Sequence, residues 1–245
     1  LNPSNTPIVL VGQSVSFSVQ SRGADLHYQW RCNGADLLGA TQALLTLAAV
    51  SQAQSGMYSV WVSNSFGGVE SAPRNLTVLT PEEQLAQLAQ ALDAPALTWS
   101  SASQYPGYGD DLKEGWFFQT NVTHDGLHAA QSGVFGGEDG DSDESWVETV
   151  LDGPGELPFW WKVSSLQDSE SLILYTNGQA RLWINAEQDW RQERVKIASG
   201  RHVVRWDYCW EHNSESTAQN RAWLDRVSFV PGEIPVLSLG EALNN

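Results

Sequence analysis

The stretch His27-Tyr-Gln-Trp-Arg-Cys32, followed at once by Asn33-Gly34, decides the fold of the first third of the chain. Its side chains alternate with a period of two, the pattern of a half-buried β-strand, and Asn-Gly is a strong signal for a tight turn. The same alternation occurs earlier, at residues 13–19. Further short strands are predicted at residues 44–47, 57–62 and 75–79. Several short strands at this spacing predict a β-sandwich over residues 1–79.

Five motifs lie along this region: Gly12-Gln-Ser-Val15, Tyr28-Gln-Trp30, Leu45-Thr-Leu47, Ser55-Gly-Met-Tyr58 and Val62-Ser-Asn64. Together they resemble an immunoglobulin I-set domain of the bacterial kind. The resemblance implies that Trp30 is the core tryptophan and that Tyr58 is the tyrosine-corner residue. The two positions that hold the inter-sheet disulfide in the family fall on Val19 and Val60. We therefore expect apolar packing to replace the disulfide.

Residues 80–95 predict a short linker helix. Thr80 is a good N-cap, Pro81 suits the first helical position, and Glu83 can reach back to the cap. The segment then carries one apolar stripe, made of Leu85, Leu88 and Leu92. Because an amphipathic helix this short is marginal by itself, we expect the stripe to pack on a neighbouring sandwich.

Residues 96–231 return to strand signals. The predicted strands cover residues 146–150, 157–163, 171–175, 181–184, 193–197, 202–208 and 222–229. The predicted turns between them contain Gly153-Pro-Gly155, Asn177-Gly178 and Ser199-Gly200. The chain is therefore predicted to be all-β, with two sandwich domains joined by one short α-helix.

The second domain carries its own set of motifs: Thr123-His-Asp-Gly126, Ala130-Gln-Ser-Gly133, Ser145-Trp146, Gly153-Pro-Gly155, Phe159-Trp-Trp-Lys-Val-Ser164, Asp189-Trp190, Gly200-Arg-His202, Trp223-Leu-Asp225 and Val227-Ser-Phe229. This set resembles a module repeated in very large surface proteins of planctomycete- and verrucomicrobia-like bacteria. The order of its strands is also similar to MAM domains and other concanavalin-like jelly rolls. Neither resemblance supplies a catalytic set.

Two similar short segments suggest that the chain comes from a tandem array of modules. Leu88-Ala-Gln-Ala-Leu92-Asp93 precedes the second domain, and Leu239-Gly-Glu-Ala-Leu243-Asn244 lies near the other end. We interpret residues 232–245 as a linker and the start of a further repeat, so that neighbouring modules of the same chain are expected partners.

The formal net charge of −16 is unevenly distributed. Residues 1–79 carry three basic and three acidic side chains, so the remaining residues carry the whole excess, 10 basic against 26 acidic. Such a surface repels nucleic acid and anionic lipid. No apolar run reaches the roughly 20 residues needed to span a bilayer, and we therefore expect no membrane insertion. Neutral glycans, cations and basic proteins are compatible with this charge.

The predicted ligand-binding residues are aromatic and acidic side chains in a Gly/Pro-rich segment and after one strand. They are Tyr105, Tyr108, Asp110, Asp111, Trp116 and Trp210. Flat rings can stack on the apolar faces of sugars, and carboxylates can accept hydrogen bonds from sugar hydroxyls. The alternative is that these rings close the end of the sandwich core.

The acidic run Asp139-Gly-Asp-Ser-Asp143-Glu144 predicts a structural Ca²⁺ site through Asp139, Asp141, Asp143 and Glu144. Alternating carboxylates supply the oxygen ligands that Ca²⁺ prefers. The run does not follow the EF-hand pattern, because Glu144 stands where that loop requires glycine. A solvated acidic loop is the alternative interpretation.

The remaining tryptophans are interpreted mainly as core residues. Trp160 and Trp161 are neighbours in one strand, so one ring is expected to face the core and the other to face away. Trp183, Trp190, Trp206 and Trp223 are expected in the core. Cys32 and Cys209 lie in different predicted domains and are expected to be free thiols rather than a disulfide.

The leading functional interpretation is a non-enzymatic binding or adhesion module of an extracellular or cell-surface bacterial protein, with carbohydrate or cell-envelope polysaccharide as its ligand. His124-Asp125 resembles a base and its orienting acid, but no activated nucleophile accompanies it, and a turn with a structural Asp is expected. Two alternatives stay open. In the first, the chain is a purely structural spacer in an adhesin or fibre. In the second, it is part of a polysaccharide-active enzyme.

Overall fold

The computed structural model describes residues 8–104, 115–133, 142–165, 170–211 and 220–233. The protein is all-β with one α-helix, as predicted. The chain forms two compact units that divide between Gln84 and Leu85.

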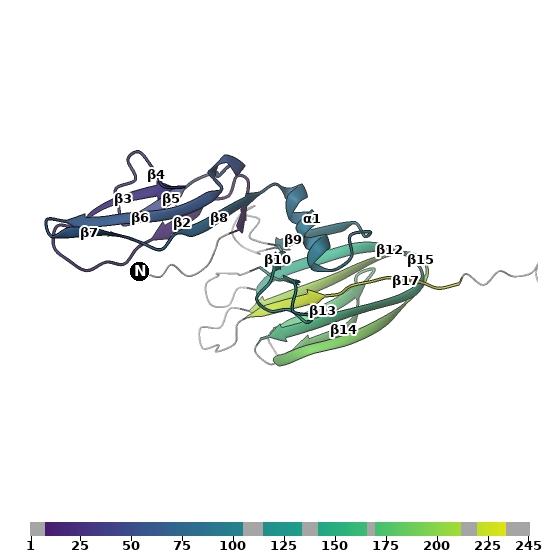
Figure 1. Ribbon diagram of the computed structural model, residues 1–245. Coiled ribbons are helices and arrows are strands. Elements are labelled where there is room, and N and C mark those ends of the chain that lie inside the picture. The colour runs from purple at the N-terminus through teal and green to yellow at the C-terminus, as the bar shows by residue number, and fades with distance from the viewer. Residues whose placement is uncertain (1–7, 105–114, 134–141, 166–169, 212–219, 234–245) are drawn as a thin grey trace, which may run out of the picture. The chain divides into compact units, whose positions relative to one another are not determined.

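The first unit is an immunoglobulin-like β-sandwich. Its elements are β1 (Ile8–Leu10), β2 (Val15–Ser18), β3 (His27–Cys32), β4 (Ala35–Asp36), β5 (Leu44–Leu47), a 3₁₀ turn (Gln52–Gln54), β6 (Gly56–Asn64), β7 (Gly67–Glu70) and β8 (Arg74–Leu79). One sheet has the order β1-β8-β6-β3-β4, with β7 paired to β6, and β2 and β5 form the other layer (Figure 1). Strand β1 pairs with β8 in parallel, whereas the other pairings in this unit are antiparallel.

The core of this unit is closed without a disulfide. Trp30 is buried and donates its indole N–H to the carbonyl of Gln42 at 2.9 Å. Val60 is buried in the same apolar cluster, and Val19 packs against that cluster, so the expected apolar replacement of the bridge is confirmed. The hydroxyl of Tyr58 donates to the carbonyl of Gln54 at 2.8 Å, which confirms the predicted tyrosine corner.

The second unit contains the helix from Leu85 onward and a nine-stranded, strongly curled sheet. Its elements are α1 (Pro81–Ala91), β9 (Trp99–Gln104), β10 (Phe117–Gln119), β11 (Ala129–Gln131), β12 (Ser142–Ser164), β13 (Ser171–Thr176), β14 (Gln179–Asn185), β15 (Glu187–Glu211), β16 (Arg221–Asp225) and β17 (Val230–Pro231). The strand order is β10-β11-β16-β12-β15-β13-β14, and β9 and β17 also pair with β12.

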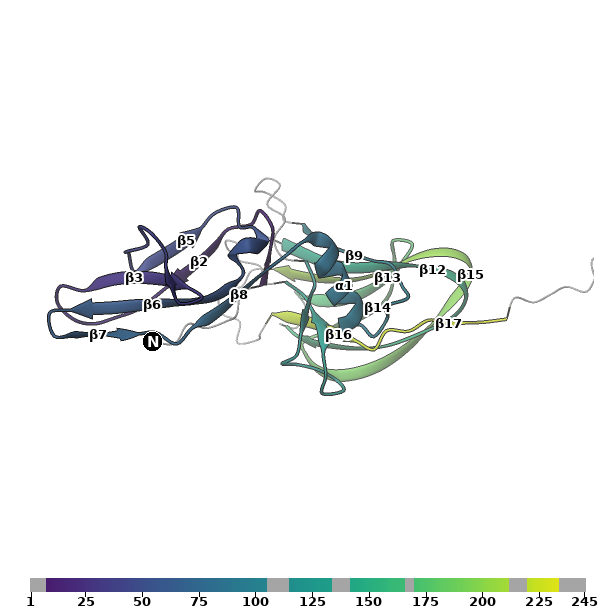
Figure 2. The ribbon, with the colours of Figure 1, turned by 45° about the horizontal axis from the view of Figure 1, so that its top comes forward.

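Two very long strands, β12 and β15, build both layers of this sandwich. They pair with each other along their whole length, as Figure 2 shows. The first half of β12 pairs with β9, and the second half pairs with β16. Strand β13 pairs with β14 on one side and with the second half of β15 on the other. The two halves therefore belong to different layers, with the apolar core between them.

The predicted turn at Gly153-Pro-Gly155 is instead a bend inside β12, and Ser199-Gly200 likewise lies within β15. The register of the two strands shifts between Gly153 and Gly155. A side chain at Gly153 would overlap the carbonyl oxygen of Ala198, and a Cβ at Gly155 would lie 2.5 Å from the ring of Phe229. Glycine is thus required for close backbone approach at the bend rather than for chain reversal. Asn177-Gly178, by contrast, does form a turn, between β13 and β14.

Helix α1 begins with the predicted capping box. The amide of Thr80 donates to the Glu83 carboxylate at 2.9 Å, and the amide of Glu83 donates to the Thr80 hydroxyl at 3.2 Å. Leu88 and Leu92 are fully buried in the core of the second unit, and Leu85 packs against it. The segment predicted as a linker is therefore, from Leu85 onward, part of the second sandwich (Figure 1).

Candidate functional site

Four of the predicted ligand-binding residues, Tyr105, Tyr108, Asp110 and Asp111, lie outside the described residues. Trp210 lies near the end of β15, where its backbone is paired with Asp143. Of the six residues, only Trp116 has a described side chain.

The prediction that Trp116 is an exposed stacking platform is wrong. The residue is 0% exposed and belongs to the core of the second unit. Its indole N–H donates to the carbonyl of Ser145 at 2.9 Å, and its amide donates to the hydroxyl of Ser101 at 2.8 Å. A ring with so much apolar surface is stabilised by burial once its single polar group has a partner, so Trp116 closes the core.

The predicted calcium residues are divided between two regions. Asp139 and Asp141 lie outside the described residues. Asp143 and Glu144 belong to strand β12 rather than to a loop, and Glu144 is opposite Gln104 on one side and Cys209 on the other. Calcium binding by this run therefore stays a prediction.

The tryptophans of the second unit divide into core and surface residues. Trp161 is buried and Trp160 is partly exposed, so the predicted alternation is confirmed. Trp206 and Trp223 are buried as expected, whereas Trp190 is partly exposed. Trp183 was expected in the core, and that expectation is wrong, because 68% of its surface is exposed.

The exposed Trp183 belongs to a row of side chains on the outer face of the layer β9-β12-β15-β13-β14. In register across that layer lie Trp146 of β12, Asp207 of β15, Ile173 of β13 and Trp183 of β14. Adjacent strands are about 4.8 Å apart, so the two tryptophans at the ends of the row are roughly 14 Å apart along the sheet. We call this surface, made of Trp146, Ile173, Tyr175, Trp183, Arg205 and Asp207, the aromatic face.

Arg205 contacts both an aromatic ring and a carboxylate on the aromatic face. Its guanidinium lies 4.7 Å from the ring centroid of Trp146 and pairs with the carboxylate of Glu148 at 2.7 Å. The hydroxyl of Ser100 also donates to Glu148, at 3.2 Å. Tyr175 is opposite Arg205 on the next strand. A flat ring, a cation and a carboxylate are thus held side by side, with hydrogen-bonding groups directed along the sheet surface.

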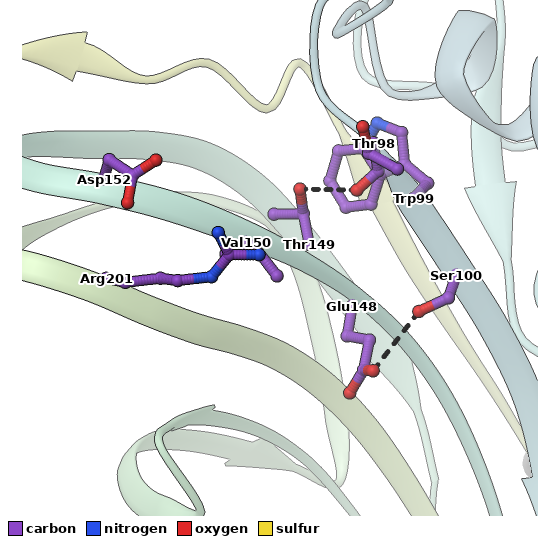
Figure 3. Close-up of a pocket in the computed structure, with 8 residues that line it drawn as sticks. All are labelled: Thr98, Trp99, Ser100, Glu148, Thr149, Val150, Asp152 and Arg201. Carbon is purple, nitrogen blue, oxygen red and sulfur yellow. Dashed lines mark hydrogen bonds between the residues drawn. The ribbon is translucent and has the colours of Figure 1, made fainter.

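A shallow pocket of about 310 Å³ continues this surface at the β9 edge. Figure 3 shows Ser100 and Glu148 on neighbouring strands, with Arg201 and Asp152 farther along the same groove. Thr149 donates its hydroxyl to the carbonyl of Thr98 at 2.9 Å and fixes the rim. The groove is lined by Thr98, Trp99, Ser100, Glu148, Thr149, Val150, Asp152 and Arg201.

Asp207 is the most perturbed carboxyl of the aromatic face. Only 5% of the residue is exposed, and this burial raises the pKa of Asp207 to about 7, with Glu144 and Glu148 adding to the rise and Arg205 opposing it. Burial also raises the pKa of the neighbouring Cys209 thiol to about 12. Both cysteines are free, as expected, and Cys209 has no thiolate character at neutral pH.

A second group of aromatic rings surrounds the turn after β10. The ring of His124 stacks on Trp160 with centroids 3.7 Å apart and meets Trp190 edge-on at 6.1 Å. The turn itself is structural, as expected: Asp125 accepts a hydrogen bond from the amide of Leu127 at 2.9 Å. Because His124 covers one face of Trp160, this group offers less free ring surface than Trp183.

The same turn lies beside a buried carboxyl. The amide of His124 donates to one oxygen of Asp225 at 2.9 Å. Burial raises the pKa of Asp225 to about 6; the amides of His124 and Arg226 lower it, and the nearby Asp125 and Asp93 raise it. Asp93, Asp125 and Asp225 form a group of three carboxylates.

The aromatic face was not predicted from the sequence, but its signal is present there. In the strand from Gln179 to Asn185, Trp183 has the same parity as Arg181, whereas Leu182 and Ile184 have the opposite parity. Trp146 likewise shares its parity with Glu144 and Glu148. Because alternate side chains face opposite sides, these charged neighbours indicate an outward direction for both rings.

No protein-family model matches the sequence, and no curated protein matches it. Solved structures give only distant likenesses. The secreted serine protease VesC from Vibrio cholerae is 15% identical with a TM-score of 0.38, over 90% of this chain and 44% of that chain. The chain thus spans less than half the length of VesC.

Two other solved structures give likenesses that are equally distant. TmCBM61, solved in complex with beta-1,4-galactotriose, is 12% identical with a TM-score of 0.37, over 59% of this chain and 94% of that chain. The immunoglobulin domains 1–4 of Sidekick-1 are 11% identical with a TM-score of 0.31, over 94% of this chain and 72% of that chain. The neighbours therefore include an immunoglobulin-domain protein and a carbohydrate-binding module. Among the described residues, no helix is both long and apolar enough to cross a membrane.

Proposed function

We propose that the chain is a non-enzymatic, glycan-binding module of an extracellular or cell-surface bacterial protein, and that the second unit binds a neutral polysaccharide on the aromatic face. The observation that carries this proposal is the row from Trp146 to Trp183, in which Trp183 is 68% exposed on a strand of the sheet. A large apolar ring held in water is stabilised when a sugar ring stacks on it.

The polar groups beside the rings suit a neutral ligand. Arg205 and Glu148 satisfy each other in an ion pair, yet Glu148 also accepts from the hydroxyl of Ser100, so the pair sits within a hydrogen-bonding surface. The net charge of −16 disfavours polyanions, whereas it does not hinder an uncharged polysaccharide. The roughly 14 Å between the end rings spans more than one sugar ring, which favours a chain rather than a monosaccharide.

The geometry supports binding rather than catalysis. Glycoside hydrolysis uses two carboxyls that flank the scissile bond. On the aromatic face Asp207 is almost fully buried, and Glu148 is paired with Arg205. The burial of Asp207 and the ion pair of Glu148 therefore favour a binding surface over a pair of catalytic carboxyls.

The test is titration of the full chain with soluble neutral polysaccharides, including a β-1,4-galactan, alongside a polyanion such as polygalacturonate. Wild type should bind at least one neutral polymer. Trp183→Ala should weaken that binding about five- to tenfold, because one stacked ring contributes about 1 kcal/mol, while the melting temperature stays unchanged.

Trp190→Ala is the matched control, since it removes a partly exposed tryptophan that is not in the aromatic face. It should leave the affinity unchanged. Equal weakening by both variants, or loss confined to Trp190→Ala, would place the site elsewhere. The absence of any polysaccharide binding would support the structural spacer instead.

A further inference from the structure

Three carboxylates from distant parts of the sequence meet in the second unit, away from the aromatic face. Asp93 follows the end of helix α1, Asp125 lies in the turn after β10, and Asp225 ends β16. One oxygen of each lies within 4.8 Å of one oxygen of each of the others. Like charges this close repel each other unless something between them compensates.

Hydrogen bonds from the backbone hold two of these carboxylates, Asp125 and Asp225, in place. The amide of His124 donates to one oxygen of Asp225, and the Asp125 carboxylate accepts from the amide of Leu127. The amide of Val227 donates to the carbonyl of Leu92 at 2.8 Å, which ties the segment after β16 to the end of the helix. The three acids are therefore brought together by the fold of the unit and not by attraction among themselves.

The second oxygen of Asp225 is the observation that points to a ligand. The residue is 0% exposed, and its Oδ1 atom has no hydrogen-bond partner among the described residues. An unsatisfied buried carboxylate oxygen is strongly destabilising, and native structures rarely retain one without a bound water or ion. The ring Nε2 of His128 lies 3.9 Å from a carboxylate oxygen of Asp93, which is beyond hydrogen-bonding distance.

We infer that Asp93, Asp125 and Asp225 form a binding site for one hard divalent cation, with Ca²⁺ as the ion it fits best. Ca²⁺ binds oxygens at 2.3–2.6 Å, so two oxygens on one ion are at most about 5 Å apart, and the 4.8 Å limit of the group satisfies this condition. The three ligands are all carboxylate oxygens, which favours Ca²⁺ over softer ions such as Zn²⁺. This site shares no residue with the acidic run at residues 139–144.

A cation here would join three elements of the second unit. It would fix the turn that places His124 on Trp160, the end of α1 and the end of β16. The expected effect is therefore on the stability of the whole unit, and it is independent of whether the aromatic face binds a glycan.

The test is thermal unfolding of the full chain in 1 mM EDTA and in 10 mM CaCl₂, with Mg²⁺ and Zn²⁺ in separate samples. At the roughly 0.1–1 mM Kd of extracellular calcium modules, calcium should raise the melting temperature of the second unit by about 3–7 °C. Asp125→Asn and Asp93→Asn should each reduce this increase to less than about 1 °C.

The order of the melting temperatures of wild type and variants, with and without calcium, shows whether these carboxylates bind the ion. In EDTA the two single variants should melt at or above the wild-type temperature, because each removes one of three mutually repelling charges. Asp125→Asn also keeps an oxygen that accepts from the amide of Leu127. In calcium both variants should melt below the wild-type temperature. The triple variant Asp139→Asn, Asp141→Asn, Asp143→Asn tests the acidic run separately and should still be stabilised by calcium, because it keeps Asp93, Asp125 and Asp225. A wild type insensitive to calcium, a response retained in both single variants, or stabilisation by Zn²⁺ alone would overturn the inference.

Discussion

At the residue scale, the sequence predicted the environments of some aromatic side chains correctly and of others wrongly. Trp30 and Tyr58 have the predicted roles, and each donates a hydrogen bond to a backbone carbonyl of its own domain. Trp116 and Trp183 were assigned to the wrong environments. Whether a ring is buried depends on residues distant in sequence: Trp116 lies in the core cluster and donates hydrogen bonds to Ser101 and Ser145 on two strands.

Asp207 predicts a measurable pH dependence at the same scale. The folded pKa of Asp207, about 7, lies above its unfolded value of 3.8. Between these two pH values the Asp207 carboxyl is protonated in the folded protein and ionised in the unfolded chain. This contribution to stability is full below about pH 4 and is lost as the pH rises through 7. Asp207→Asn should therefore stabilise the protein at pH 8, and reduce the stability difference between pH 5 and pH 8 by roughly 2 kcal/mol. Urea unfolding of both proteins at the two pH values measures this, and identical pH profiles would refute it.

At the element scale, the sequence predicted the positions of most elements but not the length of the two longest strands. Residues 146–150 and 157–163 were separated by Gly153-Pro-Gly155, a pattern typical of a turn. In the structure the chain continues through this segment as β12, because its partner β15 bends at the same place. Long-range pairing outweighs a local turn signal here, and no feature of a single segment reports its partner.

Helix α1 allows a direct test of element packing. Leu88 is fully buried in the core of the second unit, so Leu88→Ala should destabilise that unit by about 2–5 kcal/mol. The exposed Gln90→Ala on the same helix is the control and should change stability by less than about 0.5 kcal/mol. Denaturant unfolding that resolves the two units should show the change in the transition of the second unit. A shift of the immunoglobulin-like transition instead would contradict the assignment of this helix.

At the scale of the whole molecule, the fold class and the two-sandwich organisation followed from strand periodicity and turn residues. The candidate binding surface did not, because it is made by residues of four strands that meet only in the folded sheet. Trp146 and Trp183 are 37 positions apart in sequence and lie in one row only because β15 and β13 come between them. Charge, by contrast, is visible in the sequence, and it already disfavours polyanionic partners.

The most direct test of the central claim is a titration of the ¹⁵N-labelled full chain with the bound neutral polysaccharide, followed at the tryptophan indole N–H signals. Trp183→Phe and Trp146→Phe assign two of these signals. The account predicts that the Trp183 and Trp146 signals shift upon binding, while those of the buried Trp116 and Trp206 do not. Shifts confined to Trp160 and Trp190, with Trp183 unchanged at saturation, would contradict it.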